Sequence, residues 1–380
     1  MKVLHLISSG GFYGAESMLL NLISAQRRAG IDAYLLAFEN RRNPHIEIVG
    51  KAHRRNLDAG TVLCQRRFDR DAIRRIAEVA GERGVDVIHS HGYKSNFYAY
   101  AASARLGVPF IATCHLWTQS SLAVRLYEAL DAYILRRAAH VIGVSDSIVD
   151  SLRKSGISQS KTSVIYNGIE TGPLPEVSPT LRSELGIGAA PLIGTVGRLE
   201  AQKDLPSFIE AAEHVLREVP EAVFVIVGDG SLRPTLAELI PRKKLVGRVL
   251  LLGQRDDLPN IYASLDLFVL ASVNEGLPMV LLEALSASLP VVATRVGAVP
   301  RVIDSGVSGV LVDPSNPRQL ADGLLACLRD RGYAASLGLH GRATVMEIFS
   351  SEAMSIKYLA VYERSCKDTY APQLNSMTEA

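Results

Sequence analysis

The sequence predicts an α/β protein made of two doubly wound, parallel-sheet domains in tandem. Three observations lead to this prediction. The 380 residues exceed what one hydrophobic core usually organises. Short apolar runs alternate with segments of helical period along the chain, which indicates βαβ units. The alternation pauses between residues 168 and 190, where glycine and proline are frequent, and then resumes.

The first domain is expected to span residues 1–170. Its predicted strands are residues 3–7, 33–37, 87–89, 110–113, 140–144 and 163–165. The predicted helices between them are residues 14–29, 69–83, 95–106, 121–138 and 146–155. Asp146, after Ser145, is expected to lie in the N-cap region of the last of these helices, and Gly156 is expected to end it.

The second domain is expected to span residues 185–345. Its predicted strands are residues 192–196, 224–227, 249–252, 267–270, 291–293 and 310–312. Its predicted helices are residues 205–217, 232–240, 259–263, 279–286, 300–303 and 317–329. A further helix is expected from residue 349 or 350, and residues 371–380 are expected to form a flexible tail. Ligands of such sheets bind beyond the carboxyl ends of the strands, so two facing sheets would form an interdomain cleft.

Composition favours a cytoplasmic protein. Apolar residues make up 48% and charged residues 21%, as in ordinary globular proteins. The apolar start is too short for a signal peptide, and the longest apolar region, residues 277–293, is interrupted by Glu283 and Pro290. The four cysteines are far apart and form no metal-binding motif, so we expect reduced thiols and no metal.

Charge is distributed unevenly between the two halves. The net charge is +2, but the first 170 residues are basic and the remainder is acidic. A basic half suggests an anionic partner, although a solvated basic surface explains it equally well. The arginines of this half that could form a patch are Arg54, Arg55, Arg66, Arg67, Arg70, Arg74 and Arg75, with Arg125, Arg136 and Arg137 as possible additions.

Two turns that follow predicted first strands carry anion-binding features. Residues 8–16 form a glycine-rich turn into a helix, where backbone N–H groups can approach a phosphate, although tight helix packing is an alternative. The glycine spacing is not GxGxxG, which disfavours a dinucleotide site. In the second half Arg198 and Lys203 follow a strand end, and both could hold a diphosphate or simply be exposed cations.

The segment 274–284 is the most informative. Glu275 precedes a helix that Pro278 is expected to open, and Glu283 lies on that otherwise apolar helix. A buried carboxylate needs a partner, so Glu283 is expected to meet ligand hydroxyls, a cation or a salt-bridge partner. Two carboxylates beside two cations and a helix N-terminus are typical of a nucleotide-sugar site.

These motifs make the chain resemble the retaining glycosyltransferases of family four, which have the GT-B fold. The resemblance runs along nearly the whole chain and includes GFYGAE, HSHGYKSN, ATCHLW, VIGVSDSIVDSL, VIYNGIE, GTVGRLEAQKDL, FVIVGDG, LLGQRDD and EGLPMVLLEA. It implies two Rossmann-like domains facing a cleft, with the C-terminal helix crossing back to the first domain. It also implies transfer of a hexose from a nucleotide-diphosphate sugar, UDP by family frequency, without a metal or other cofactor.

The resemblance implies roles for individual residues. Arg198 and Lys203 would hold the donor diphosphate, with the backbone of Met279, Val280 and, from the other domain, Gly11 near the phosphates.

Glu275 would accept hydrogen bonds from the donor sugar, with Leu277 beside it, and Glu283 from the ribose. Arg255 and Leu258 would flank the base. His115 would lie near the transferring sugar, so the catalytic set would be His115, Arg198, Lys203 and Glu275.

Partners and alternatives also follow from the resemblance. The first domain would bind a glycan or lipid-linked acceptor of cell-surface polysaccharide synthesis, with peripheral contact to an anionic membrane and no nucleic acid. Pro278, Asp204 and Ser288 depart from the usual family pattern and are expected to tune donor choice. A nucleotide-sugar 2-epimerase of the same fold and a non-catalytic sugar-nucleotide-binding protein are the alternatives.

Overall fold

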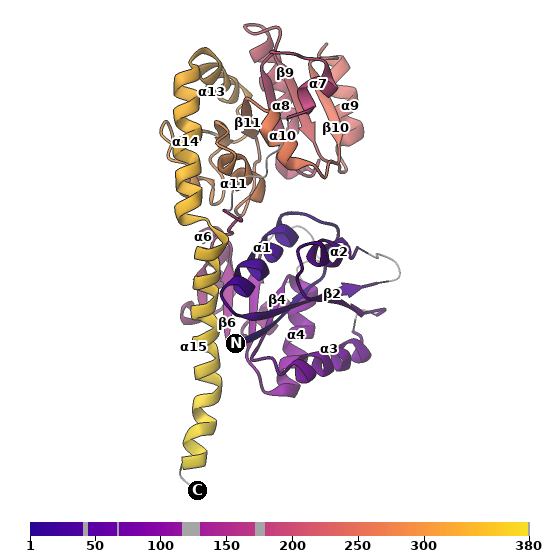
Figure 1. Ribbon diagram of the computed structural model, residues 1–380, viewed down its shortest axis with the longest axis vertical. Helices are drawn as coiled ribbons and strands as arrows, with labels where there is room; N and C mark the ends of the chain where they lie inside the picture. Colours follow the sequence, from indigo (N-terminus) through magenta and orange to yellow (C-terminus); the bar gives the residue numbers. More distant parts are fainter. Residues whose placement is uncertain (41–44, 67, 116–129, 172–178, 379–380) are drawn as a thin grey trace. The chain divides into compact units, whose positions relative to one another are not determined.

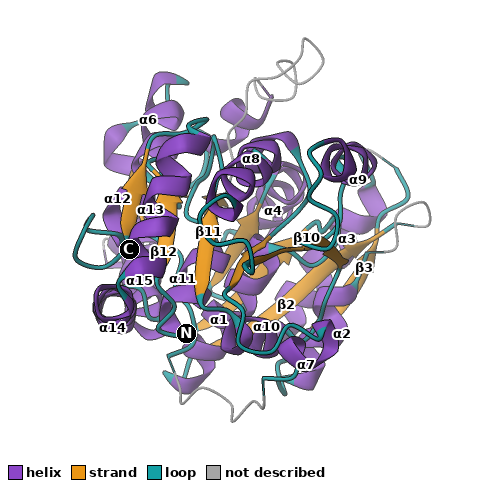
Figure 2. Cartoon of the chain, turned by 90° about the horizontal axis from the view of Figure 1, so that it is seen from above, coloured by secondary structure: helices purple, strands orange, loops and turns teal. Residues whose placement is uncertain are grey.

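The computed structural model describes residues 1–40, 45–66, 68–115, 130–171 and 179–378 (Figure 1). The chain forms two compact units. The first consists of Met1–Glu170 together with Ser351–Ala380, and the second of Thr171–Ser350. Helices and strands alternate along most of both units. Figure 2 shows the strands in orange and the helices in purple.

The first unit is built on a parallel sheet in the order β3-β2-β1-β4-β5-β6-β7. Its strands are β1 (Lys2–Ile7), β2 (Asp32–Glu39), β3 (Ala59–Leu63), β4 (Val87–His91), β5 (Phe110–Cys114), β6 (His140–Gly143) and β7 (Thr162–Val164). The strand order reverses between β1 and β4, so the loops after these two strands diverge at the carboxyl edge and leave room for a ligand.

Helices cover both faces of this sheet. They are α1 (Gly14–Arg28), α2 (Glu47–Arg54), α3 (Arg70–Arg83), α4 (Tyr93–Leu106) and α6 (Asp146–Lys154), joined by the long C-terminal helix α15 (Ser351–Thr378). Alternate residues of each strand face opposite sides. Leu4 and Leu6 pack with α3 and α4, whereas Leu35 and Ile7 pack with α1 and α2.

The second unit repeats this architecture with the order β10-β9-β8-β11-β12-β13. Its strands are β8 (Leu192–Val196), β9 (Val223–Val227), β10 (Val249–Gly253), β11 (Leu267–Leu270), β12 (Val291–Thr294) and β13 (Val310–Val312). Its helices are α7 (Leu181–Leu185), α8 (Leu205–Leu216), α9 (Arg233–Arg242), α10 (Leu258–Ser264), α11 (Met279–Ser286), α12 (Val299–Val302), α13 (Pro317–Arg329) and α14 (Arg331–Ile348). Phe208 and Phe224 meet edge to face in its core.

The predicted elements and the observed ones differ in a few places. The sequence did not predict α2, β3, α7 or α14. Of the helix predicted at residues 121–138, residues 121–129 lie outside the described part, and residues 130–135 are helical. The helix α15 continues to Thr378, through most of the segment expected to be a flexible tail. Pro278 caps α11, which begins at Met279, instead of occupying its first turn.

The chain leaves the first unit after Glu170 and returns to it at Ser351, where α15 begins. The backbone N–H of Ser351 donates to the carbonyl of Ile169 at 2.7 Å. Tyr358 and Tyr362 of α15 are fully buried there. Across the described residues, no helix is long and apolar enough to cross a bilayer.

Candidate active site

The second unit has its strand-order reversal between β8 and β11, and most of the predicted site residues of this unit follow these strands. Arg198 and Lys203 lie on the connection from β8 to α8, and Glu275 on the connection from β11 to α11. The two connections are joined because the N–H of Val273 donates to the carbonyl of Gln202 at 2.9 Å.

Close backbone packing fixes the shape of these loops. A Cβ on Gly297, whose φ is +52°, would lie 2.0 Å from the carbonyl oxygen of Glu275. A Cβ on Gly228, whose φ is +134°, would lie 1.9 Å from the carbonyl oxygen of Gly197. Only glycine fits both the left-handed conformation and the contact at these positions. The loops that carry Glu275 and Arg198 therefore pack closely against the turns at Gly297 and Gly228, respectively.

Lys203 and Glu275 form a buried ion pair. Nζ of Lys203 lies 2.5 Å from Oε1 of Glu275, and the side chains are 14% and 8% exposed. Ser272 donates a second hydrogen bond to the same oxygen at 2.7 Å. Removing two charges from water is costly unless they pair and form further hydrogen bonds, and this pair satisfies both conditions. The structure thus joins two predicted site residues that are far apart in the sequence.

Arg198 is half-buried on the turn immediately after β8. Its backbone neighbour Leu199 is anchored, because the N–H of Leu199 donates to the carbonyl of Asp229 at 2.9 Å. Hydrogen bonds from Ser231, with the nearby positive charge of Arg198, lower the pKa of Glu200. Arg198 thus lies at the carboxyl edge of the sheet of the second unit.

The helix α11 begins beside the ion pair. It has no side-chain cap, so its first N–H groups, including those of Met279 and Val280, lack a capping oxygen from the N-cap residue. Leu277 and Met279 are buried. Glu283 is half-buried and accepts a hydrogen bond from Tyr262 at 2.7 Å. Burial, together with this carboxylate, raises the pKa of Tyr262 well above its ordinary value.

Arg255 is engaged by carboxylates of its own unit. Nε and Nη2 of Arg255 donate to the two oxygens of Asp257 at 2.8 and 2.7 Å, and Nη1 donates to Glu184 at 3.0 Å. The bidentate contact lowers the pKa of Asp257 and raises that of Arg255. Leu258, the first residue of α10, is half-buried beside this cluster. A ligand that contacts the Arg255 guanidinium must compete with two acids.

In the first unit, the turn after β1 is held by Glu16 of α1. Glu16 is buried and accepts hydrogen bonds from Ser9 at 2.9 Å and from the N–H of Tyr13 at 3.0 Å. Gly11 is buried with φ +142°, a conformation that favours glycine. The rigid turn places a backbone loop at the reversal between β1 and β4.

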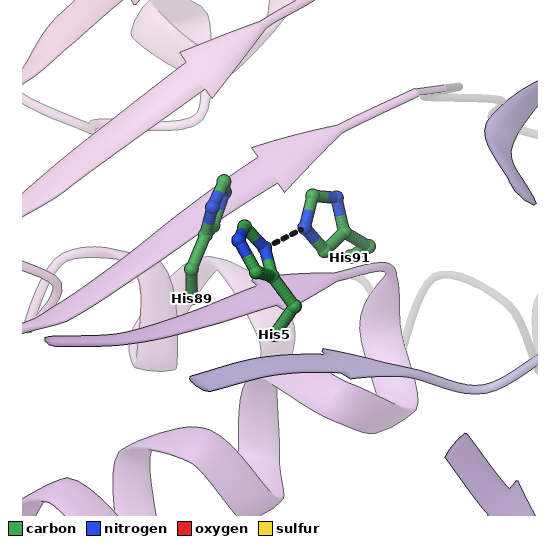
Figure 3. Close-up of side chains that lie close together, drawn as sticks. All are labelled: His5, His89 and His91. Atoms are coloured by element: carbon green, nitrogen blue, oxygen red, sulfur yellow. Dashed lines mark hydrogen bonds between the residues drawn. The ribbon is translucent and has the colours of Figure 1, made fainter. Parts of the chain in front are cut away.

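His115 follows β5, the next strand beyond β4. Its Nε2 lies 3.3 Å from Nδ1 of His91, and the two rings stack at 5.6 Å. Burial lowers the pKa of His115 to about 4, so the imidazole is neutral at pH 7. Three buried histidines, His5, His89 and His91, lie close together in the sheet (Figure 3), and His91 lies next to His115.

Several residues of the site were missed from the sequence. Ser272 and Tyr262 support the two glutamates, but a serine or tyrosine at these spacings has no distinctive pattern. The inward-facing histidines could have been found. The strand predicted at residues 87–89 ends at His89, and its continuation through Ser90 to His91 would place both histidines on one face.

Comparisons with known families agree along most of the chain. Residues 12–172 match the family model described as Glycosyltransferase Family 4, and residues 190–330 match the one described as Glycosyl transferases group 1.

Characterised relatives cover most of both sequences. The N-acetyl-alpha-D-glucosaminyl L-malate synthase of Bacillus anthracis is 27% identical over 79% of this chain and 80% of its own. The D-inositol 3-phosphate glycosyltransferase of Xylanimonas cellulosilytica is 30% identical over 74% and 72%, respectively. A UDP-Gal:alpha-D-GlcNAc-diphosphoundecaprenol alpha-1,3-galactosyltransferase of Escherichia coli is 29% identical over 65% and 67%.

Solved structures confirm the fold. HepE from Anabaena, in complex with UDP-glucose, has a TM-score of 0.82 at 23% identity, over 96% of this chain and all of its own. The two parallel-sheet, Rossmann-like units therefore match the GT-B architecture expected from the sequence.

Proposed function

The chain belongs to glycosyltransferase family 4, and from this premise we propose that it is a retaining, metal-independent enzyme that transfers a hexose from a UDP-sugar to a glycan or lipid-linked acceptor. Its membership makes it a glycosyltransferase. The donor, the acceptor class and the stereochemistry are the proposal. Cell-surface polysaccharide synthesis on the cytoplasmic side of a membrane is the pathway that we propose for it.

The observation that carries the proposal is the pairing of Lys203 with Glu275 at the strand-order reversal, next to the turn that bears Arg198. The pair keeps the Lys203 ammonium and the Glu275 carboxylate, a hydrogen-bond acceptor, together where little of either side chain is exposed to water. A UDP-sugar would place its diphosphate near the cations and a sugar hydroxyl near the carboxylate. The uncapped first turn of α11 offers N–H groups to the same diphosphate. Complexes of HepE with UDP and with UDP-glucose support this choice of donor.

The chemistry follows from the charges that develop during transfer. When the glycosyl–phosphate bond breaks, the diphosphate gains negative charge and the sugar gains positive charge. Arg198 and Lys203 stabilise the leaving diphosphate because they are pre-organised and partly shielded from water. The acceptor hydroxyl attacks from the face that the diphosphate leaves, and a phosphate oxygen takes its proton. This front-face course retains the anomeric configuration, and it uses His115 as a neutral contact to the sugar.

The donor is tested by a thermal-shift screen of nucleotide sugars, followed by mass spectrometry of products with lipid-linked and free glycan acceptors. We expect a UDP-sugar to give the largest shift and NMR of the product to show the anomeric configuration of the donor. An inverted product would overturn the retaining assignment. Conversion of the donor to its 2-epimer without an acceptor would favour the epimerase alternative.

Metal independence has its own test. The cations of Lys203 and Arg198 take the role of a divalent ion at the diphosphate, so transfer is expected to continue in EDTA. Strict dependence on Mg²⁺ or Mn²⁺ would contradict this part of the proposal.

Membrane docking is proposed for the basic patch of the first unit. Arg54, Arg66 and Arg70 are exposed, and Phe68 beside them is 55% exposed. Other members of the patch are partly neutralised, since Arg74 pairs with Asp71 at 3.1 Å. Arg67 and Arg125 lie outside the described residues.

Liposome flotation measures this docking. We expect the protein to float with vesicles that contain anionic lipid and to remain behind with neutral ones. Equal flotation with both kinds of vesicle would contradict the proposed docking on an anionic membrane.

A further inference from the structure

A chain of buried hydrogen bonds leads from helix α1 to His115. Oε1 of Gln26 lies 2.8 Å from Nε2 of His5, and Nδ1 of His5 lies 3.2 Å from Nε2 of His91. Nδ1 of His91 then lies 3.3 Å from Nε2 of His115. Gln26, His5 and His91 are at most 3% exposed. Water therefore does not compete for the hydrogen bonds among these three residues, whereas His115 at the end of the chain of contacts is half-buried.

The register of the sheet explains why the rings meet. His5 of β1 is paired with His89 of β4, and His91 is paired with Thr113 of β5. Because alternate residues share a face, these four side chains point to the same side of the sheet. Figure 3 shows His5, His89 and His91 close together, with the hydrogen bond between His5 and His91.

A second branch holds the amide of Gln26. Its Nε2 donates to the hydroxyl of Tyr362 on α15 at 3.2 Å, and this hydroxyl lies 2.8 Å from Nδ1 of His89. Nε2 of His89 lies 2.8 Å from Oγ1 of Thr113. With its nitrogen directed to Tyr362, Gln26 directs its oxygen to His5.

The three clustered histidines could be taken for a metal site, because their ligand atoms lie within 4.8 Å of one another. Both ring nitrogens of His5, His89 and His91, however, already lie within hydrogen-bond distance of a partner. A metal ion would need deprotonated nitrogens turned to one point and would break this network. The arrangement is that of a hydrogen-bonded relay.

The relay has a direction because each neutral imidazole has one donor and one acceptor nitrogen. Burial lowers the pKa of His5 to about 4 and those of His89 and His91 well below the ordinary value, so all are neutral at pH 7. The Gln26 oxygen accepts from Nε2 of His5, which leaves Nδ1 of His5 as an acceptor for His91. Nδ1 of His91 is then an acceptor for Nε2–H of His115.

We propose that Gln26, His5 and His91 are positioning residues that hold His115 in one tautomer, with its proton on Nε2 and its Nδ1 presented as a hydrogen-bond acceptor. Among the described residues, Nδ1 of His115 has no hydrogen-bond partner. It is available to accept from a hydroxyl of the transferring sugar, a step that rests on the function proposed above. The identity of a glutamine on α1 thus decides what the active-site histidine can bind.

The tautomer is measured directly by NMR of the full-length protein labelled with ¹⁵N-histidine, with the His115 signals assigned through a His115→Gln variant. We expect one neutral form of His115 at pH 7, protonated at Nε2. A proton on Nδ1, or a mixture of both forms, would overturn the proposal. This measurement needs no substrate, so it stays interpretable even if no UDP-sugar is used by the enzyme.

Two tyrosines of α15 provide a matched pair of variants. Tyr362→Phe removes the hydroxyl that orients Gln26, and we expect both tautomers of His115 to become populated. Tyr358 is equally buried, and its hydroxyl contacts Thr113 at 3.1 Å, outside the path from Gln26 to His115. Tyr358→Phe should leave the tautomer unchanged. Identical spectra for the two variants would contradict the relay.

Gln26→Met, which keeps the shape of the side chain and removes its oxygen, tests the catalytic consequence. We expect kcat to fall about 10-fold, which is roughly what one hydrogen bond contributes. The dissociation constant for UDP should be unchanged, because Gln26 is not among the residues proposed to contact UDP. An unchanged kcat with an altered UDP affinity would refute the positioning role. Absent turnover in wild type, with the expected tautomer present, would refute the proposed function alone.

Discussion

Replacement of Lys203 by methionine is the sharpest test of the site in the second unit. The change keeps most of the side-chain volume and removes the charge that lies 2.5 Å from Glu275. The carboxylate of Glu275 is 8% exposed and would retain the hydrogen bond from Ser272. Stability and turnover should both fall, for different reasons.

The loss of stability can be estimated from the burial of the pair. Removal of one partner from a buried ion pair costs about 3–5 kcal/mol, and the remaining hydrogen bond from Ser272 places this case near about 3 kcal/mol. For a unit of this size, about 3 kcal/mol lowers the melting temperature by roughly 6–12 °C. Turnover should fall by about 10²–10³, as when one donor to a developing oxyanion is removed.

A double variant separates the two effects. In Lys203→Met with Glu275→Gln, no unpaired charge remains, so we expect much of the lost stability to return while turnover stays low. Lys243→Met is the control, because Lys243 pairs with Glu213 at 2.9 Å in a more exposed position. Its loss should cost less than about 1 kcal/mol and leave turnover unchanged.

Calorimetry of the four proteins, combined with release of UDP from the donor in the presence of acceptor, provides the data. The reasoning fails if Lys203→Met melts with wild-type temperature, or if the double variant recovers turnover along with stability. The first result would mean that the pair is not desolvated, and the second that the cation has no role in the reaction.

Other predictions concern single positions in either unit. Arg198→Ala should lower kcat by about 10²–10³, because it removes a positive charge from the leaving diphosphate; a normal kcat would exclude it from the reaction. Gly297→Ala would bring a Cβ to 2.0 Å from the carbonyl oxygen of Glu275 and should lower the melting temperature of the second unit strongly. Gly186→Ala, also at positive φ but with no atom within 4 Å of the added Cβ, should cost only about 1–2 kcal/mol of backbone strain. The pKa of His115 is lowered from 6.5 to about 4, so between these pH values the unfolded chain binds more protons than the folded one. The stability of the first unit should therefore fall as the pH drops from about 6.5 to 4. Melting curves with no such dependence would contradict the burial of this ring.

The sequence was sufficient to predict both sheets because their central strands are continuous apolar runs. The predictions at residues 192–196 and 267–270 coincide with β8 and β11. The sequence was insufficient to predict the strand at the edge of the first sheet. The strand β3 lies at an edge of its sheet and is only partly buried, so it lacks the apolar run that marks a strand buried on both faces.

The candidate site shows a similar division. The spacing of Glu275 and Glu283 on one loop and helix was apparent from the sequence, as was the strand-end location of Arg198. The pairing of Lys203 with Glu275 was not apparent, because the number of residues between two positions does not tell how close their side chains lie in space. Support from Ser272 and Tyr262 depends on loop conformation and on packing between α10 and α11, which no local pattern encodes.

The position of α15 has a consequence for how the protein is made. The hydroxyl of Tyr362 and the backbone of Ser351 complete hydrogen bonds with residues that leave the ribosome hundreds of residues earlier. The N-terminal unit therefore remains unfinished until α15 has been made, and the face of α1 that meets α15 stays uncovered until then. The second unit, which ends at Ser350, has its full sequence before the first unit does. Premature termination before residue 351 would leave that nascent surface open to chaperones and to aggregation.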